Sequence, residues 1–277
     1  MENHFNTPAE ALELNMKAGV NKASMPILKM ILLGIMAGAF IALGGATSST
    51  AAHNISNVGL ARLVAGCIFP IGLMIIVFVG GELFTGNCLL VMDVLDKRIK
   101  VVECIRNLVV VWLSNLVGAL IIDVLIYFSG NLNYTAGLNG AYAIKVAVSK
   151  AAISPVTAIT SGILCNILVC IAILVALAAK DLGGKIWGIF FPIMAFVVGG
   201  FEHVVANMFY IPMGMMAKCN PVFVSKAIEA YGMTQDQLDS LNMSGLLSNF
   251  LFVTIGNILG GMLFVGVPCY LASKRKW

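Results

Sequence analysis

Six long apolar stretches, separated by short polar segments, constrain the fold of this chain more than any other feature. They run near 28–50, 62–92, 104–128, 157–179, 186–211 and 247–272. A helix needs roughly 20 apolar residues to cross the hydrocarbon core of a bilayer. Hydrophobic residues make up 60% of the chain and charged residues only 11%, whereas an average soluble domain has about 25% charged residues. The sequence therefore predicts an integral membrane protein with six transmembrane helices.

One membrane domain is expected to cover residues 1–277, because no polar stretch is long enough to form a second domain. Within it, residues 1–26 would form an amphipathic cytoplasmic segment, 27–272 the six-span region and 273–277 a cytoplasmic tail. Thr7 and Pro8 are typical of a helix N-cap and a first helical residue. The N-terminal stretch carries acids and has no basic stretch before a short apolar run, so we do not expect a cleavable signal peptide.

Basic residues are distributed unevenly between the two sides that six spans define. The side that holds both termini has twelve lysines and arginines, and the other side has five. Cytoplasmic loops carry an excess of these residues, so both termini are expected to be cytoplasmic, with the chain in the inner (cytoplasmic) membrane. The basic residues are scattered over the loops, which predicts no nucleic-acid partner.

The two halves of the chain share a motif. The stretch "VGGELFTGNCLL" (79–90) resembles "VGGFEHVVANMF" (198–209), and "WLSNLVGALI" (112–121) resembles "TIGNILGGML" (254–263), which makes Asn115 and Asn257 equivalent. Spans one to three would then repeat as spans four to six. An odd number of spans in each half forces the copies into opposite orientations, which is an inverted repeat.

Paired glycines interrupt the second and fifth spans at matching positions of this repeat. They let the backbone leave the helix and expose unpaired N–H and C=O groups, which are tolerated only inside protein or along a cavity. Each helix that restarts directs a positive dipole end toward the midplane. A simple kink with packing glycines is the alternative. Two breaks, each with a glutamate and an asparagine, favour a functional centre.

Three motifs in these regions resemble the formate/nitrite transporter family. They are "ELFTGN" (82–87), "CNILVCIA" (165–172) and "GFEHVVANMFYIP" (200–212). The resemblance covers almost the whole chain. It implies an all-α, aquaporin-like membrane fold with helices two and five broken, assembled as a homo-pentamer with one pore in each protomer. It also implies a channel for small monovalent anions of weak acids, which include formate, nitrite and hydrosulfide.

The resemblance further implies roles for individual residues. His203 corresponds to the central pore histidine of the family and Thr85 to its hydrogen-bonding partner, while Glu202 and Asn207 complete the histidine motif. Lys150 and Asn166 correspond to residues that attract and hold the anion. The apolar constrictions would comprise Phe69, Leu73 and Phe84 on the cytoplasmic side and Leu83, Val169 and Phe196 on the outer side.

Alternatives remain open for several of these polar residues. An intramembrane histidine such as His203 is functional by default. Glu202 and Glu82 could serve only to pin freed backbone N–H groups, and Lys150 could be an interfacial lysine whose ammonium reaches water. Asp123 lies inside the third span, where a structural hydrogen bond or a contact between protomers is expected.

No cofactor and no metal site are predicted, and the chain is not expected to be an enzyme. The seven cysteines lie mostly within apolar segments and are interpreted as small buried hydrophobic residues. A membrane-embedded enzyme would need a nucleophile–base pair or a metal cluster at the midplane, and the spans offer only one histidine. Two alternatives to an anion channel of this kind remain: a channel for neutral solutes such as water or glycerol, and, within the family, a hydrosulfide-selective channel.

The expected mechanism is passage of the anion as its neutral acid or together with a proton. Lys150 and the positive helix ends would draw the anion inward, and the falling dielectric would raise its proton affinity. A proton would arrive from water or through His203, with Thr85 and Asn166 in polar contact at the centre. The expected partners are small monovalent anions, protons, the lipid bilayer and further copies of the chain.

Overall fold

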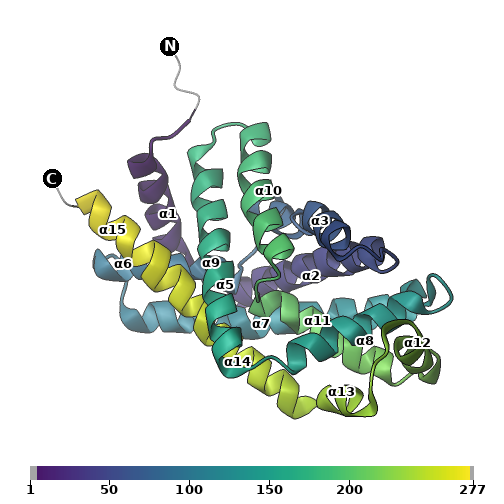
Figure 1. Cartoon of the computed structure of the whole chain (residues 1–277). Helices are drawn as coiled ribbons and strands as arrows, with labels where there is room; N and C mark the ends of the chain where they lie inside the picture. The colour runs from purple at the N-terminus through teal and green to yellow at the C-terminus, as the bar shows by residue number, and fades with distance from the viewer. Residues whose placement is uncertain (1–4, 275–277) are drawn as a thin grey trace.

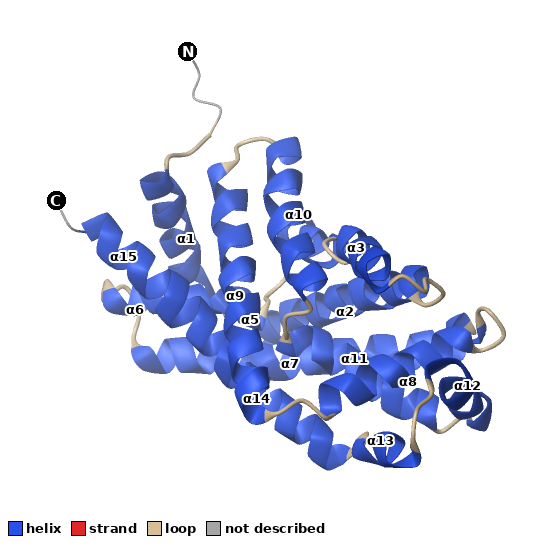
Figure 2. Ribbon diagram, viewed as in Figure 1, coloured by secondary structure: helices blue, strands red, loops and turns tan. Residues whose placement is uncertain are grey.

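The computed structural model describes residues 5–274, nearly all of which are helical, with no β-strand in that range (Figure 2). Six segments of it are long and apolar enough to cross a membrane, which agrees with the prediction. They are α2 (Ile27–Ala52), α3 with α4 (Val58–Ile68 and Ile71–Val79), α7 (Val101–Phe128), α9 (Pro155–Ala178), α10 (Leu182–Gly199), and α14 with α15 (Met243–Gly261 and Val267–Lys274).

Shorter elements complete the fold. They are α1 (Pro8–Ala23), α5 (Phe84–Asn87), η1 (Cys88–Leu90), α6 (Val91–Leu95), η2 (Asn131–Asn133), α8 (Leu138–Ala151), α11 (Val204–Lys218), α12 (Pro221–Tyr231), α13 (Gln235–Ser240), and a π-helical turn, η3 (Met262–Gly266), between α14 and α15. Helices α1 and α15 lie at one end of the molecule, and α8, α12 and α13 lie at the opposite end (Figure 1).

Helix α1 begins where the sequence predicts. The Thr7 hydroxyl accepts from the Glu10 N–H at 3.3 Å, and the Glu10 carboxylate accepts from the Thr7 N–H at 2.7 Å, with Pro8 as the first helical residue. This reciprocal cap satisfies two N–H groups that the helix leaves unpaired. Arg98 anchors α1 to the rest of the molecule, because its guanidinium contacts the Glu13 carboxylate at 2.7 and 2.9 Å.

The α1 end of the molecule holds a small charge network. Arg98 also donates to Asp96 at 2.7 Å, and Lys274 contacts the other Asp96 oxygen at 2.8 Å. Hydrogen bonds from Lys274 and Arg98 lower the pKa of Asp96 to about 2. Asp96 therefore stays ionised throughout the physiological pH range, and it joins the segment after α6 to the end of α15.

Two helix pairs, α2 with α7 and α9 with α14, contact each other along much of their length. Glycines allow these helices to approach closely. A Cβ atom at Gly118 on α7 would collide with the Ile35 carbonyl of α2, and one at Gly256 on α14 would collide with the Ile159 carbonyl of α9. Small residues at such crossings are typical of membrane helices, where close van der Waals packing drives association. Each pair joins the first and third spans of one half.

The second and fifth spans are both broken, as the sequence predicts. Helix α4 ends at Gly80 with φ +102°, and α10 ends at Gly200 with φ +70°. Only glycine adopts such angles without a steric penalty. Residues 81–83 and 201–203 then run outside helices before α5 and α11 begin. A continuous helix through position 203, which would have contradicted the prediction, does not occur.

In each half, one asparagine side chain holds the break with a matching set of three hydrogen bonds, which we call the asparagine brace. The Asn115 side-chain oxygen accepts from the Phe84 N–H at 3.0 Å, and its amide donates to the Gly34 and Glu82 carbonyls at 2.8 and 2.9 Å. In the other half, the Asn257 side chain accepts from the Val204 N–H at 2.9 Å and donates to the Gly162 and Glu202 carbonyls at 2.8 and 2.9 Å. The matching partners confirm the predicted repeat of three spans and the equivalence of Asn115 and Asn257.

Candidate functional site

The two breaks meet at a single polar contact. Thr85, in the first turn of α5, lies with its hydroxyl oxygen 2.9 Å from Nε2 of His203, the residue that precedes α11. Both side chains are buried, with 0% and 2% of their surface exposed. The contact joins the two halves of the chain at their discontinuities. It is the pair that the sequence motifs single out as the centre of the pathway.

The local backbone selects the tautomer of His203. Its Nδ1 accepts a hydrogen bond from the Ala206 N–H at 3.0 Å, so that His203 caps the start of α11. A nitrogen that accepts cannot also carry a proton, and the neutral ring therefore has its proton on Nε2. The Nε2–H group donates to the Thr85 hydroxyl oxygen. The hydroxyl hydrogen of Thr85 is then free to donate to a third group.

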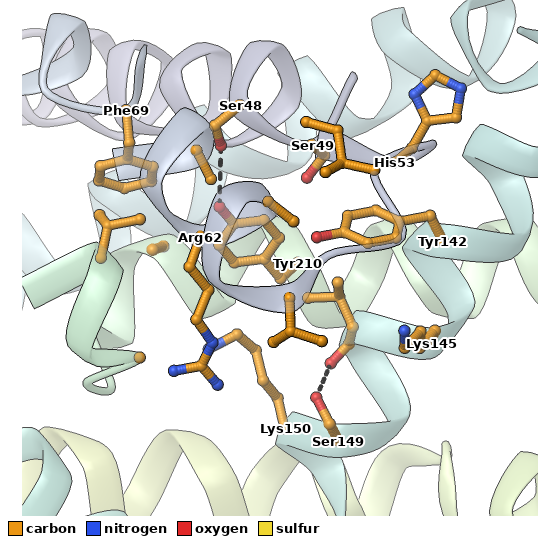
Figure 3. Close-up of a pocket in the computed structure, with 18 of the residues that line it drawn as sticks. Ser48, Ser49, His53, Arg62, Phe69, Tyr142, Lys145, Ser149, Lys150 and Tyr210 are labelled. Atoms are coloured by element: carbon orange, nitrogen blue, oxygen red, sulfur yellow. Dashed lines mark hydrogen bonds between the residues drawn. The ribbon is translucent and has the colours of Figure 1, made fainter. Parts of the chain in front are cut away.

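Aromatic rings enclose this contact on one side. The His203 ring stacks on Phe196, with centroids 5.8 Å apart and planes inclined by 28°. Phe196 in turn meets Phe69 edge to face, with centroids 5.5 Å apart. All three rings line a cavity of about 710 Å³, which we call the α8-side vestibule. Figure 3 shows Phe69 among its lining residues. Thr85 itself does not line this cavity.

A second cavity, of about 360 Å³, lies on the other side of the breaks and is called the α1-side vestibule. Leu73 and Leu83 line it, and Asn15, Ala18 and Gly19 of α1 form part of its wall. The N-terminal helix therefore covers part of one mouth of the candidate pathway. His203 lines the α8-side vestibule beside Phe69 and Phe196, whereas Thr85 lines neither cavity.

The structure groups two constriction residues differently from the sequence-based expectation. That expectation placed Phe69 with Leu73, and Leu83 with Phe196. In the structure Phe69 lies against Phe196 at the α8-side vestibule, whereas Leu83 and Leu73 both line the α1-side vestibule. The cavity that a residue lines depends on its position along the helix and relative to the break. Leu73 lies one helical turn past Phe69, and Leu83 follows the break, so residues close in sequence to Phe69 line the opposite cavity. Phe84 and Val169 are buried and line neither vestibule.

A charged cluster stands beside the break of the fifth span. The Lys150 ammonium contacts Glu202 Oε1 at 2.9 Å, and the Asn207 amide donates to Glu202 Oε2 at 2.6 Å. Asn207 also donates to Asn249, whose own amide donates to the Lys150 carbonyl at 2.9 Å. The cluster therefore ties α8, the break, α11 and α14 together. Glu202 is ion-paired here, beyond the backbone-pinning role considered from the sequence.

An equivalent cluster lies in the first half, and the sequence analysis did not identify it. Lys22 contacts Glu82 at 3.0 Å, and Asn87 donates to Glu82 at 2.7 Å and to Asn107 at 2.8 Å. Asn107 donates to the Lys22 carbonyl at 3.2 Å. The sequence indicates the glutamate and the asparagine of each break, but not Lys22 or Asn107 as their partners. Alignment of the two halves with Asn115 on Asn257 matches Asn107 to Asn249. Alignment with Gly80 on Gly200 matches Glu82 and Asn87 to Glu202 and Asn207.

That alignment also shows where the halves differ. His203 corresponds to Leu83, and Thr85 corresponds to Val205. The central contact therefore takes one polar residue from each half, while the equivalent positions are aliphatic. The carboxylate clusters are symmetric, but the hydrogen-bonding centre is not.

The side chain of Asn166 binds backbone carbonyls and is not available to hold an anion, the role that the family resemblance implies. Its amide donates to the Thr85 carbonyl at 3.1 Å and to the Asn257 carbonyl at 2.6 Å, so both N–H groups are used. It is fully buried and lines neither vestibule. Asn166 therefore positions the Thr85 backbone and has no donor left for an anion.

The sequence predicts a structural hydrogen bond or a contact between protomers for Asp123. The residue is fully buried in α7, and neither carboxylate oxygen has a hydrogen-bond partner among residues 5–274, so the expected hydrogen bond does not form within that range. No contact of this side chain links it to the Thr85–His203 pair.

Removing one member of the buried ion pair is expected to destabilise the protein. Lys150→Met would leave the Glu202 carboxylate, 7% exposed, without its counter-ion, which should cost about 3–5 kcal/mol. Adding Glu202→Gln in the same chain should recover most of the loss, because no buried charge then remains. The thermal unfolding midpoint of the purified protein in detergent measures both effects.

The matched control is Lys226→Met, at an exposed ion pair with Glu229 on α12, where the expected cost is about 0–1 kcal/mol. If Lys150→Met lowered the midpoint no more than Lys226→Met, the buried pair would not contribute to stability as argued.

Comparisons with known proteins agree with this geometry. The family model described as "Formate/nitrite transporter" matches residues 9–271. The formate channel BtFdhC of Bacillus thuringiensis is 37% identical, over 98% of this chain and 97% of its own. The formate channel FocA of Haemophilus influenzae is 36% identical, over 94% and 92%.

Solved structures are similar over almost the full length. One described as an "FNT family ion channel" superposes with a TM-score of 0.81 at 26% identity, over 95% of this chain and 98% of its own. A pentameric formate channel with formate bound superposes with a TM-score of 0.79 at 30% identity, over 90% and 98%.

Proposed function

The chain belongs to the formate/nitrite transporter family, whose members are channels and transporters rather than enzymes, and on that premise we propose that it conducts formate and similar small monovalent anions as neutral acids or together with a proton. The observation that carries the proposal is the Thr85–His203 contact between two broken spans, with Phe69 and Phe196 beside His203 at the α8-side vestibule and Leu73 and Leu83 lining the α1-side vestibule. A pathway built in this way offers polar contact at one point and hydrocarbon on either side of it.

The energetic cost of the apolar rings favours the neutral acid. Moving a small ion into a medium of low dielectric costs on the order of 20 kcal/mol by a Born estimate, and several kcal/mol after relaxation. Protonating an acid of pKa about 4 at pH 7 costs only about 4 kcal/mol, at about 1.36 kcal/mol per unit. Protonation before the constriction is therefore the cheaper route. A weaker acid such as hydrosulfide would need still less.

Thr85 and His203 complement this route. In the tautomer selected by Ala206, the Nε2–H of His203 donates to Thr85, and the Thr85 hydroxyl donates to the oxygen of a passing acid or anion. The contact replaces one hydrogen bond to water at the narrowest point. To supply a proton to the anion, His203 must first take one up and carry protons on both ring nitrogens, which temporarily breaks the Nδ1 bond to the Ala206 N–H. A proton taken directly from water leaves that bond intact.

We further propose a homo-pentamer in the cytoplasmic membrane, with both termini cytoplasmic. The excess of basic residues on the α1 side supports this orientation, and the structural relative with formate bound is pentameric. In that arrangement the α1-side vestibule opens to the cytoplasm. The α8-side vestibule, with Lys150, Glu202 and Asn207 beside the break, opens to the outside.

Transport by the purified protein in liposomes, with pH and membrane voltage set separately, tests the proposal. We expect formate flux to rise as pH falls at constant total formate, to carry one proton per formate, and to be insensitive to voltage. Flux that follows voltage without a co-moving proton would contradict neutral passage. Liposomes without protein provide the background, because the neutral acid also crosses lipid.

A panel of solutes separates the alternatives. Formate, nitrite and hydrosulfide are expected to pass, with formate favoured because the curated relatives cited above are formate channels. Glycerol should not pass, because polar contact is confined to the Thr85–His203 pair and no continuous polar stripe crosses the constriction. Hydrosulfide flux without formate flux would favour the hydrosulfide-selective alternative.

A further inference from the structure

Four charged side chains line the α8-side vestibule. Three are basic, namely Arg62 of α3 and Lys145 and Lys150 of α8 (Figure 3). The fourth, Glu202, is acidic. An anion that enters this cavity meets the net charge of the wall, which depends on how these groups are paired. The sequence motifs pointed to Lys150 as the group that attracts the anion.

The ion pair neutralises Lys150. Its ammonium lies 2.9 Å from the Glu202 carboxylate, and the two side chains are only 15% and 7% exposed. Opposite charges this close act as a dipole at the distance of an incoming ion, because their fields largely cancel. The second Glu202 oxygen is held by Asn207, which keeps the carboxylate beside the ammonium. Lys150 therefore adds little net charge to the vestibule.

Arg62 has no acidic partner in the part of the chain that the structure describes. Its single protein hydrogen bond is from Nη1 to the Val198 carbonyl, at 3.3 Å. The side chain is exposed to the cavity, and its guanidinium lies against the turn at Gly200, where a Cβ atom would come within 2.8 Å of Nη1. Gly200 is two residues before Glu202 and three before His203. The guanidinium thus stands at the broken span with most of its donors unused.

Lys145 is also free of carboxylates within residues 5–274. Its ammonium lies 4.3 Å from the centroid of the Tyr231 ring, a cation–π contact that holds the side chain but leaves its charge uncompensated. The residue lies on the exposed side of α8 and lines the same cavity as Arg62. The net charge of the vestibule therefore comes from Arg62 and Lys145.

We propose that Arg62, assisted by Lys145, forms the anion-collecting site of the α8-side vestibule and selects planar oxoanions such as carboxylates and nitrite. The inference rests on the proposed function and assigns its specificity to residues outside the family motifs. A guanidinium presents a planar fork of N–H donors that matches two oxygens at once, whereas an ammonium is a point charge. Formate and nitrite each offer two oxygens in one plane. Hydrosulfide offers a single sulfur and gains nothing from the fork.

Replacing the guanidinium should weaken anion binding in the α8-side vestibule without changing passage at the Thr85–His203 pair. We expect Arg62→Gln to raise the formate concentration at half-maximal flux by about tenfold, the ratio that one charged hydrogen bond of about 1.4 kcal/mol represents. Maximal flux should change little, because Thr85 and His203 are untouched. Lys145→Gln should raise the half-saturating concentration less, by about two- to threefold, because it removes charge without the fork.

Arg62→Lys separates shape from charge. It keeps the positive charge and removes the planar fork. We expect it to raise the half-saturating concentrations of formate and nitrite nearly as much as Arg62→Gln does, and to leave that of hydrosulfide unchanged. An equal effect on all three anions would overturn the assignment of planar selectivity.

Lys226→Gln is the control for a lost positive charge near the same end of the molecule, because Lys226 pairs with Glu229 and does not line the vestibule. All variants are compared in liposomes at matched protein content after size-exclusion chromatography.

If Arg62→Gln and Lys145→Gln both kept the wild-type half-saturating concentration of formate, this inference would be wrong while the proposed function stood. Absence of formate flux in the wild-type protein would instead overturn the proposed function.

Discussion

Asn257→Leu is expected to prevent assembly of a stable channel, although leucine has a similar size and suits a membrane helix. The asparagine makes three hydrogen bonds, to the Val204 N–H and to the Gly162 and Glu202 carbonyls. Each buried group left unpaired costs about 1–3 kcal/mol. The sum approaches the total stability of a typical protein, about 5–15 kcal/mol. Size-exclusion chromatography of the detergent-solubilised protein should show the loss of the folded oligomer peak.

Asn242 on the same helix is the matched control. It caps the start of α14 by accepting from the Ser244 and Gly245 N–H groups, and it is exposed. Asn242→Leu should cost only about 1 kcal/mol, the usual value of a helix cap. Asn115→Leu should be as damaging as Asn257→Leu, because its three bonds are equivalent. A folded, monodisperse Asn257→Leu protein would show that the breaks do not depend on these braces.

His203→Phe is expected to abolish most formate flux and to change the pH dependence of the flux that remains. Phenylalanine keeps the stacking on Phe196 but removes both the donor to Thr85 and the acceptor for Ala206. Loss of a hydrogen bond to a charged or partly charged solute costs about 1.5–3 kcal/mol, which lowers flux by about ten- to a hundredfold. The measurement is formate uptake into liposomes across a range of pH values at fixed voltage.

His203→Asn separates the structural role of the ring from its proton chemistry. Asparagine is a good N-cap, so it can accept from the Ala206 N–H and preserve the start of α11, but its amide does not exchange a proton near neutral pH. We expect this variant to fold as the wild type does and to retain part of the flux, with a changed pH dependence. Wild-type pH dependence in both variants would mean that His203 acts only as a helix cap.

The spans and their breaks follow from the sequence because the bilayer imposes strong local rules. Length and hydropathy alone placed six spans close to the positions where the helices lie. Glycine pairs at matching positions indicated the two breaks, since Gly80 and Gly200 adopt backbone angles that other residues avoid. Equivalence of Asn115 and Asn257 also followed from the repeat. These features depend on short stretches of chain, which a single sequence displays.

The side of each constriction and the pairing of charges did not follow from the sequence. Phe69 and Leu83 line cavities other than those of the residues grouped with them from the sequence, because which cavity a side chain faces depends on helix rotation around the break. Asn166 was expected at the anion, but its donors are used by the Thr85 and Asn257 carbonyls. Arg62 was counted only as a loop charge. These assignments depend on contacts between segments that lie far apart in the chain.

By itself, therefore, the sequence determined a six-span membrane protein with an inverted repeat, two broken helices and His203 at the second break. The length of an apolar segment and the backbone angles of a glycine are properties of short stretches of chain. In a bilayer, few structures other than a helix, or a break in one, are compatible with them. The sequence motifs already paired His203 with Thr85. Only the tertiary structure decided the direction of that hydrogen bond, the neutralisation of Lys150 by Glu202, and the lack of an acidic partner for Arg62 within residues 5–274. Hydrogen bonds and ion pairs act over a few ångströms, and whether two groups come that close is settled when the two halves of the chain pack together.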